Sequence, residues 1–425
     1  MVRPTLACLV GFALARVVAA ADFDAASATN QVGLDLFRQL ATKQPDGNLV
    51  LSPYSIESAL ALVYAGADGV TRSEMASALQ FPTDDASLVA GLGGLRHALD
   101  RVSADSVATA ESISRSGARV DPIQWNAANR LFGQVGEPLR DSFFQLMREG
   151  AAAPFEAMNF RGNAEASRAK INSWVEDTTH QKIRDLIPAG ALTADTRLVL
   201  VNALYLKAPW QQKFAKAATL PRPFRNESGG VLREVPTMQR TAPLRYAKEE
   251  GLTVVALDYL GGSLQFLILL PDEGRSLEAI ASKITADDFL RWGKSDRAPR
   301  PTSIALFLPK FRVEGKTLPL GQALRGIGVK SAFDEPRGSA NFNRMAQRSG
   351  TNYLLLSDVF HQTFIALDEE GTEAAAATAA SMALAASAVK PVEPIEVHVD
   401  RPFLFAIQHR ASGTCLFVGR ITDPR

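Results

Sequence analysis

Two serines and a histidine are the residues of this chain whose types could combine in nucleophilic chemistry. Ser52 and Ser55 lie three residues apart ahead of an apolar stretch, and His361 lies in a run typical of a strand. A serine beside a histidine base can act as a nucleophile in acyl transfer. Buried hydroxyls and imidazoles must also be hydrogen-bonded when they have no catalytic role. For that reason we favour a buried polar cluster over a catalytic set.

Motifs of other enzyme classes are absent from the sequence. It has no Gly-x-Ser-x-Gly turn, no His-Glu-x-x-His, no Cys-x-x-Cys and no Gly-x-x-x-x-Gly-Lys-Ser/Thr loop. The chain has 5 histidines, and none is paired at metal-ligand spacing. We therefore expect no catalytic residues, no metal and no cofactor.

A tract of small residues near the C-terminus is the most informative feature. Thr372 to Leu384 is almost entirely Ala, Thr and Ser, and it follows Asp368-Glu369-Glu370-Gly371. Such a tract could be a short helix or a flexible linker. Predicted strands flank it, however, at 354–367 and at 395–399 and 402–407. Small side chains lose little rotamer entropy on ordering and can pass between packed strands, so the tract predicts a loop that can become a buried strand.

Segments along nearly the whole chain resemble the serpin family, of the inhibitory type. They are 48–56, 59–62, 66–67, 171–175, 198–207 with Trp210, 308–311, 369–379, 401–405 and 416–420. The resemblance implies one α+β domain over residues 22–425. It implies a large, mostly antiparallel central sheet, further β-sheets, about eight or nine helices, and an exposed reactive loop at about 369–394. Strand-rich segments recurring between helices agree with α+β.

The resemblance also assigns site residues. The hinge of the loop would comprise Glu369, Gly371, Thr372, Glu373, Ala374, Ala375, Ala376, Ala377 and Thr378. The region where the central sheet opens would comprise Ser52, Ser55, Asn202, His361, Trp210 and Lys310. We also predict an ion pair between Lys310 and Glu369.

The implied activity is inhibition of serine proteases, not catalysis. The protease would be acylated by the loop, and insertion of the cleaved loop into the sheet would trap it irreversibly. Family loop length places the scissile bond at Ala385–Ala386, with Leu384 and Met382 as alternatives. Lys390 is disfavoured because Pro391 follows it. These residues suit an elastase- or subtilisin-like protease.

Side chains alternate between the two faces of a strand, so the residues that would point inward show whether the loop could insert. The inward side chains would be small or uncharged and include no proline; they are Thr372, Ala374, Ala376, Thr378, Ala380 and Met382. Glu373 would face solvent. This pattern favours an inhibitor, and the alternative is a non-inhibitory serpin with a carrier, storage or chaperone role.

Residues 1–21 resemble a secretory signal peptide, with Arg3, an apolar segment from Leu6 to Val18, and Ala19 to Ala21 before the cleavage point. We therefore expect a secreted or periplasmic protein. Removal of the leader would take Cys8 with it, leaving only Cys415 and no intrachain disulfide. The alanine-rich composition suits a GC-rich, bacterial genome, and the sequon at Asn226 would be used only in a eukaryote.

The charge balance limits the partners. With 46 basic and 45 acidic residues, the formal net charge is +1, which argues against nucleic acid and anionic membranes as partners. Acidic residues interrupt the bases Arg96, His97 and Arg101, so we expect no glycosaminoglycan site. We expect a monomer whose partner is the target protease.

Local patterns predict several elements. We expect helices over Asn30–Thr42 and Ile56–Ala65, and strands over Leu252–Tyr259 and Leu264–Leu270. Ser103–Gly117 is rich in Ser and Ala, and we expect a poorly ordered connection or a variable helix end there.

Overall fold

The computed structural model describes residues 23–44, 47–143, 155–226, 230–293, 300–373 and 393–425. Predictions that concern residues 1–21, 374–378, 380, 382, 384–386 and 390 lie outside this part of the chain. The described residues form helices and two large β-sheets, as expected for α+β. Eight α-helices lie among them: α1 (Ala25–Lys43), α2 (Pro53–Gly66), α3 (Gly69–Leu79), α4 (Asp85–Arg115), α6 (Phe160–Thr178), α7 (Leu277–Lys283), α8 (Ala286–Gly293) and α9 (Gly321–Gly326).

The central sheet is the one that carries most of the predicted site. Its strands run in the order β10 (Phe311–Glu314), β12 (Leu356–Leu367), β13 (Gly371–Thr372), β4 (Leu198–Pro209), β2 (Gln124–Gln134) and β3 (Phe155–Met158), with β11 (Leu318–Pro319) beside β12. Most pairings in this sheet are antiparallel, but β12 pairs with β4, and β2 with β3, in parallel.

The second sheet holds the C-terminal strands. Its order is β1 (Leu49–Leu51), β16 (Cys415–Ile421), β15 (Phe403–His409), β8 (Leu264–Pro271), β7 (Leu252–Asp258), β6 (Val231–Glu249), β9 (Arg300–Pro309) and β14 (Ile395–His398), with β5 (Leu220–Arg225) beside β6. The predicted strands over 252–259 and 264–270 are thus confirmed as β7 and β8. Cys415 is buried in β16.

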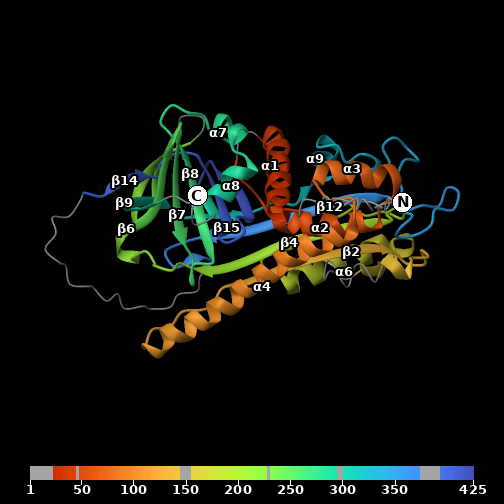
Figure 1. Cartoon of the computed structure of the whole chain (residues 1–425), viewed down its shortest axis with the longest axis horizontal. Helices are drawn as coiled ribbons and strands as arrows, with labels where there is room; N and C mark the ends of the chain where they lie inside the picture. Colours follow the sequence, from red (N-terminus) through yellow and green to blue (C-terminus); the bar gives the residue numbers. More distant parts are fainter. Residues whose placement is uncertain (1–22, 45–46, 144–154, 227–229, 294–299, 374–392) are drawn as a thin grey trace, which may run out of the picture.

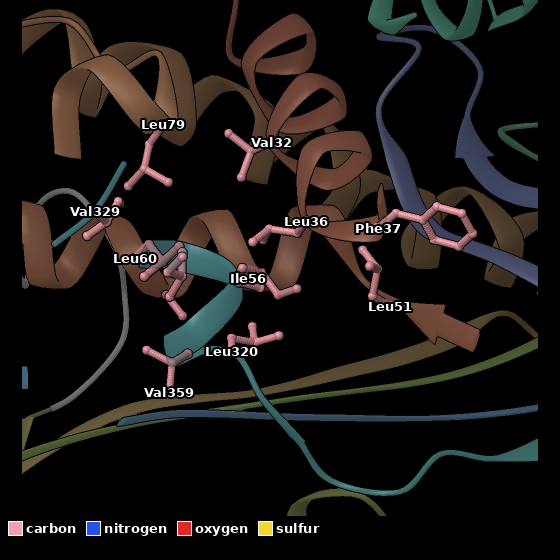
Figure 2. Packing of buried hydrophobic residues seen from close by; sticks show 14 of the residues in the cluster. Val32, Leu36, Phe37, Leu51, Ile56, Leu60, Leu79, Leu320, Val329 and Val359 are labelled. Atoms are coloured by element: carbon pink, nitrogen blue, oxygen red, sulfur yellow. The ribbon is translucent and has the colours of Figure 1, made fainter. Parts of the chain in front are cut away.

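Helices cover both faces of the central sheet, and the period-two alternation of β4 explains how (Figure 1). Leu198 and Leu200 belong to the apolar core that contains α2, whereas Val199 and Val201 belong to the core that contains Ile171 of α6. In the α2 core, Ile56 and Leu60 pack with side chains of α1, α3 and β12 (Figure 2). Because both faces of β4 are buried, its register is strongly specified.

Capping sets the helix starts that the apolar pattern placed too late. Asp24 accepts hydrogen bonds from the backbone N–H groups of Ala26 and Ser27, so α1 begins at Ala25. Ser52 Oγ accepts from the N–H of Ser55 at 3.3 Å, and Pro53 occupies the first helical position of α2.

Of the two alternatives for residues 103–117, the structure shows the helix end and not the poorly ordered connection. This segment continues α4 as far as Arg115 (Figure 1). Val102, Ser106 and Ala110 recur at helical spacing on its buried side, and Ser106 Oγ accepts a hydrogen bond from Ile123 N–H at 2.9 Å. Tertiary contacts therefore order a segment whose composition indicated weak order. Among the described helices, none is long and apolar enough to cross a membrane.

Candidate functional site

The predicted polar cluster is present where α2 meets the central sheet. His361 on β12 lies level with Asn202 on β4, and Asn202 lies level with Asn129 on β2. Ser52 and Ser55 come from the start of α2. Ser52, Ser55, Asn202 and His361 have no exposed surface. The cluster therefore links two neighbouring strands to the helix beneath them.

The hydrogen bonds of this polar cluster leave no catalytic base. His361 Nε2 accepts from the backbone N–H of Ser52 at 3.1 Å, and Nδ1–H donates to Asn202 Oδ1. Asn202 Nδ2 donates to Ser55 Oγ at 2.6 Å and to Asn129 Oδ1 at 2.7 Å. Burial lowers the pKa of His361 to about 3. The imidazole is neutral and its lone pair is occupied, so Ser52 and Ser55 have no base to activate them.

Strands β4 and β12 pair directly with each other over their N-terminal parts and separate towards their C-terminal ends. The parallel ladder runs from Leu356 opposite Leu198 to Thr363 opposite Leu204. Within the described residues the two strands have no ladder pairing beyond this point. At their far ends, Thr372 of β13 pairs antiparallel with Leu367 of β12 and also with Ala208 of β4. A short strand thus already lies between β4 and β12.

A tight turn over residues 368–371 reverses the chain into β13. Asp368 Oδ1 accepts from the backbone N–H groups of Glu370 and Gly371, and Asp368 N–H donates to Gly371 O at 2.9 Å. Gly371 has φ +150°, and a Cβ there would lie 2.2 Å from Ala208 O. Only glycine can approach β4 this closely.

Aromatic side chains hold the first hinge residues in the sheet. Thr372 is fully buried, and its hydroxyl lies 2.5 Å from the Tyr259 hydroxyl. The Tyr259 ring stacks on Trp210 at 4.6 Å, and Trp210 Nε1–H donates to Asp368 O at 2.9 Å. Burial raises the pKa of Tyr259, so its hydroxyl stays protonated and can hydrogen-bond with Thr372.

Lysine side chains pair with Glu369, Glu370 and Glu373, in and beside the predicted hinge. Lys310 Nζ lies 2.9 Å from Glu369 Oε2, which confirms the predicted ion pair. Burial opposes ionisation of Glu369, but hydrogen bonds from Lys310 and Thr219 lower its pKa below the usual value. Lys213 Nζ lies 2.5 Å from Glu370 Oε2, and Lys182 pairs with Glu373.

The residues predicted for sheet opening fall into two separate groups. Ser52, Ser55, Asn202 and His361 form the polar cluster, while Trp210 and Lys310 contact the hinge. Asn202 and Ala208 are six residues apart on β4, so the two groups lie about 20 Å apart along the strand. Glu369, Gly371, Thr372 and Glu373 are the hinge residues that the structure describes.

Several site residues were not predicted. Asn129 is bonded to both Ser55 and Asn202, and its position as a polar residue in strand β2 was a usable signal. Tyr259, Tyr205 and Lys182 were not assigned to the hinge. No local pattern links these three residues to positions 372 and 373, because the contacts depend on the tertiary structure.

Within the described residues, no group of three or more His, Cys, Asp or Glu side chains could hold a metal ion. The arrangement instead provides a sheet that is open at one end, with a strand starting in the opening.

Comparisons with known proteins give a consistent result. A family model described as "Serpin (serine protease inhibitor)" matches residues 27–424. Plasminogen activator inhibitor 2 of Homo sapiens is 33% identical over 94% of this chain and 100% of its own. The leukocyte elastase inhibitor of Bos taurus is 34% identical over 94% of this chain and 99% of its own. The crystal structure of uncleaved ovalbumin superposes with a TM-score of 0.78 at 25% identity, covering 95% of this chain and 100% of that one.

Proposed function

The chain belongs to the serpin family, and from this premise we propose that it is an irreversible suicide-substrate inhibitor of serine proteases. The observation that carries the proposal is that Thr372 pairs with both β12 and β4, where those strands separate. The proposed reactive loop spans about residues 369–394 of a single domain over 22–425, and it would act in a monomer.

The proposed reaction is acylation of the protease by the loop. The protease serine attacks the carbonyl carbon of Ala385, the Ala385–Ala386 peptide bond breaks, and Ala386 leaves as a new amino terminus. The protease then remains attached to Ala385 as an ester. Insertion of residues 373–385 between β4 and β12 carries the protease away before water can hydrolyse this ester.

The pairing of β13 sets the register for this insertion. Continuing it by six residues brings Thr378 level with His361 on β12 and Asn202 on β4. Thr378 would then separate the two side chains and replace their mutual hydrogen bond with its own hydroxyl. The polar cluster therefore offers hydrogen-bond partners to an inserted threonine. An apolar residue at the same position would leave the groups of His361 and Asn202 that now bond to each other without a partner.

The driving force is new backbone pairing and burial. Each inserted residue adds ladder hydrogen bonds, and a typical bond contributes about 0.5–1.5 kcal/mol net. The inward positions Ala374 and Ala376 come level with Ile365 and Thr363 of β12. Small side chains there add burial without a volume conflict.

The test is trapping of a protease by the mature protein. Pancreatic elastase and subtilisin should each give an SDS-stable band near the summed masses, and the released peptide should begin at Ala386. An Ala385→Arg variant should redirect inhibition to trypsin, whereas the matched Ala386→Arg variant should not, because the residue before the scissile bond fills the specificity pocket. Redirection by Leu384→Arg or Met382→Arg would move the bond to those residues.

Cleavage without trapping would contradict the proposal. If every protease nicks the loop and stays active, and the nicked protein gains no heat stability, a non-inhibitory carrier, storage or chaperone role replaces it. We also propose export through residues 1–21, and N-terminal sequencing of protein from the source should find Asp22 first.

A further inference from the structure

Glu373 has a backbone conformation that ends the short strand β13. Its N–H donates to Ala366 O at 2.8 Å, which continues the pairing with β12 by one bond. Its φ is +45°, in the left-handed region that residues with a Cβ seldom adopt. Strand β13 therefore ends at Thr372, and something must hold the Glu373 conformation in place.

Two side chains hold the Glu373 carboxylate. Lys182, from the segment after α6, forms an ion pair with it, and the lysine Nζ also lies 5.4 Å from the Phe364 ring centroid. Tyr205 of β4 donates its hydroxyl to the same carboxylate. Burial, the charge of Glu373 and this hydrogen bond raise the pKa of Tyr205 to about 12. We call Glu373, Lys182 and Tyr205 the Glu373 latch.

The latch lies where the next inserted residues would go. The ladder between β4 and β12 ends at Leu204 and Thr363, and β13 pairs with β4 only at Ala208 and Pro209 and with β12 only at Leu367. Tyr205 of the latch and Phe364, whose ring lies beside Lys182, are the first residues beyond the ladder. Between these two paired ends, β4 and β12 do not pair with each other. We call this short region between the two strands the wedge.

Insertion requires Glu373 to leave this conformation. Its N–H is already bonded to Ala366, so a change of φ from the left-handed to the extended region swings Cβ about the N–Cα bond. A side chain that swings in this way cannot keep its present contacts with both Lys182 and Tyr205. These contacts therefore favour the state in which insertion has stopped after Thr372.

We propose that Lys182 and Tyr205 are positioning residues that arrest loop insertion at Thr372 until the loop is cleaved. This inference rests on the proposed function, because it concerns the timing of the same insertion. The segment containing Lys182 carries further left-handed residues, His180, Gln181 and Asp185, so its path over the sheet is itself closely defined. His180 packs against the Tyr205 ring at 5.4 Å.

The test measures insertion in the uncleaved, full-length mature protein without any protease. Lys182→Met keeps the stem over Phe364 but removes the charge, and Tyr205→Phe removes only the hydroxyl. Each variant, and wild type, is incubated with an acetylated peptide of the sequence 372–384, and its incorporation is followed on native gels. Spontaneous conversion to a heat-stable form is followed in parallel samples without peptide. We expect both rates to rise roughly two- to fivefold in each variant, as loss of a partly exposed ion pair or one hydrogen bond allows.

Lys216→Met is the matched control, because Lys216 pairs with the neighbouring Glu370 at 3.4 Å and lies outside the wedge. Lys216→Met should leave both rates unchanged. Lys182→Arg keeps the positive charge, so both of its rates should equal those of wild type. Unchanged rates in Lys182→Met and Tyr205→Phe, with insertion occurring in wild type, would overturn the latch alone. If no variant or wild type ever inserts peptide or gains heat stability, even after loop cleavage, both the latch and the proposed function are overturned. Equal acceleration by Lys216→Met would also overturn the latch, because the effect would then be general loss of charge.

Discussion

Replacement of Thr372 by arginine should convert the inhibitor into a substrate. Thr372 is fully buried, its hydroxyl lies 2.5 Å from that of Tyr259, and both neighbouring strands pair with it. In the uncleaved protein, the loop can withdraw the introduced arginine from this position. After cleavage, insertion must bury the guanidinium at this fully buried position, beside the stacked rings of Tyr259 and Trp210.

The magnitude follows from the cost of an unpaired buried charge, about 3–5 kcal/mol. A factor of ten in rate corresponds to about 1.4 kcal/mol, so insertion should slow about a hundredfold or more. Thr372→Val replaces the hydroxyl with a methyl group and leaves Tyr259 without its partner, at a cost of about 1–3 kcal/mol. Trapping should therefore be most efficient in wild type, weaker in Thr372→Val and weakest in Thr372→Arg.

The assay is titration of elastase or subtilisin with each variant, with the products separated on denaturing gels. Wild type should give mainly the SDS-stable complex, and Thr372→Arg should give mainly cleaved inhibitor with active protease. Equal stoichiometry of inhibition for wild type and Thr372→Arg would refute the reasoning. It would mean that Thr372 is not buried when the loop inserts.

Three further predictions concern single residues. Gly371→Ala should release β13 from β4, because the new Cβ would meet Ala208 O, and hydrogen exchange at the Thr372 amide should rise at least tenfold. His361 has a folded pKa of about 3, below its unfolded value, so the free energy of unfolding should fall as pH drops from about 6.5 towards 3. His361→Gln should reduce that slope in denaturant titrations at several pH values, and an unchanged slope would exclude His361 as its source. Burial raises the pKa of Glu57 well above its usual value, so its contribution to stability should be lost as pH rises above about 4.5. Glu57→Gln should therefore unfold at a higher temperature than wild type at pH 8 but not at pH 4, and equal differences at both values would contradict this.

Local patterns in the sequence were sufficient for much of the architecture. Alternating apolar residues identified β7 and β8, and helical spacing identified most of α1 and α2. The same reasoning could not decide between a poorly ordered connection and a helix end for residues 103–115, because Ser and Ala carry little hydrophobic signal. The hydrogen bond from Ile123 to Ser106, and burial of Ala110, stabilise that part of α4.

The candidate site was predictable in its residue types but not in all of its contacts. Ser52, Ser55, Asn202 and His361 were expected to be hydrogen-bonded together, and Lys310 was expected to pair with Glu369. These residues separate into two groups because they lie at different positions along β4. Those positions depend on the register of β4 with its neighbouring strands. Asn129 completes the polar cluster because the register of β2 on β4 places it opposite Asn202.

The sequence by itself determined that a tract of small, uncharged residues follows a glycine between two strands, and hence that it could enter a sheet. It also determined that no common enzyme motif is present. Only the tertiary structure decided which two strands pair with Thr372 and which side chains contact Glu373. Lys182 and Tyr205 lie far from Glu373 in the chain, and they meet it because β4, β12 and the segment after α6 pack together. Such contacts arise from the strand register and from packing on both faces of the sheet, which no local pattern of residues encodes.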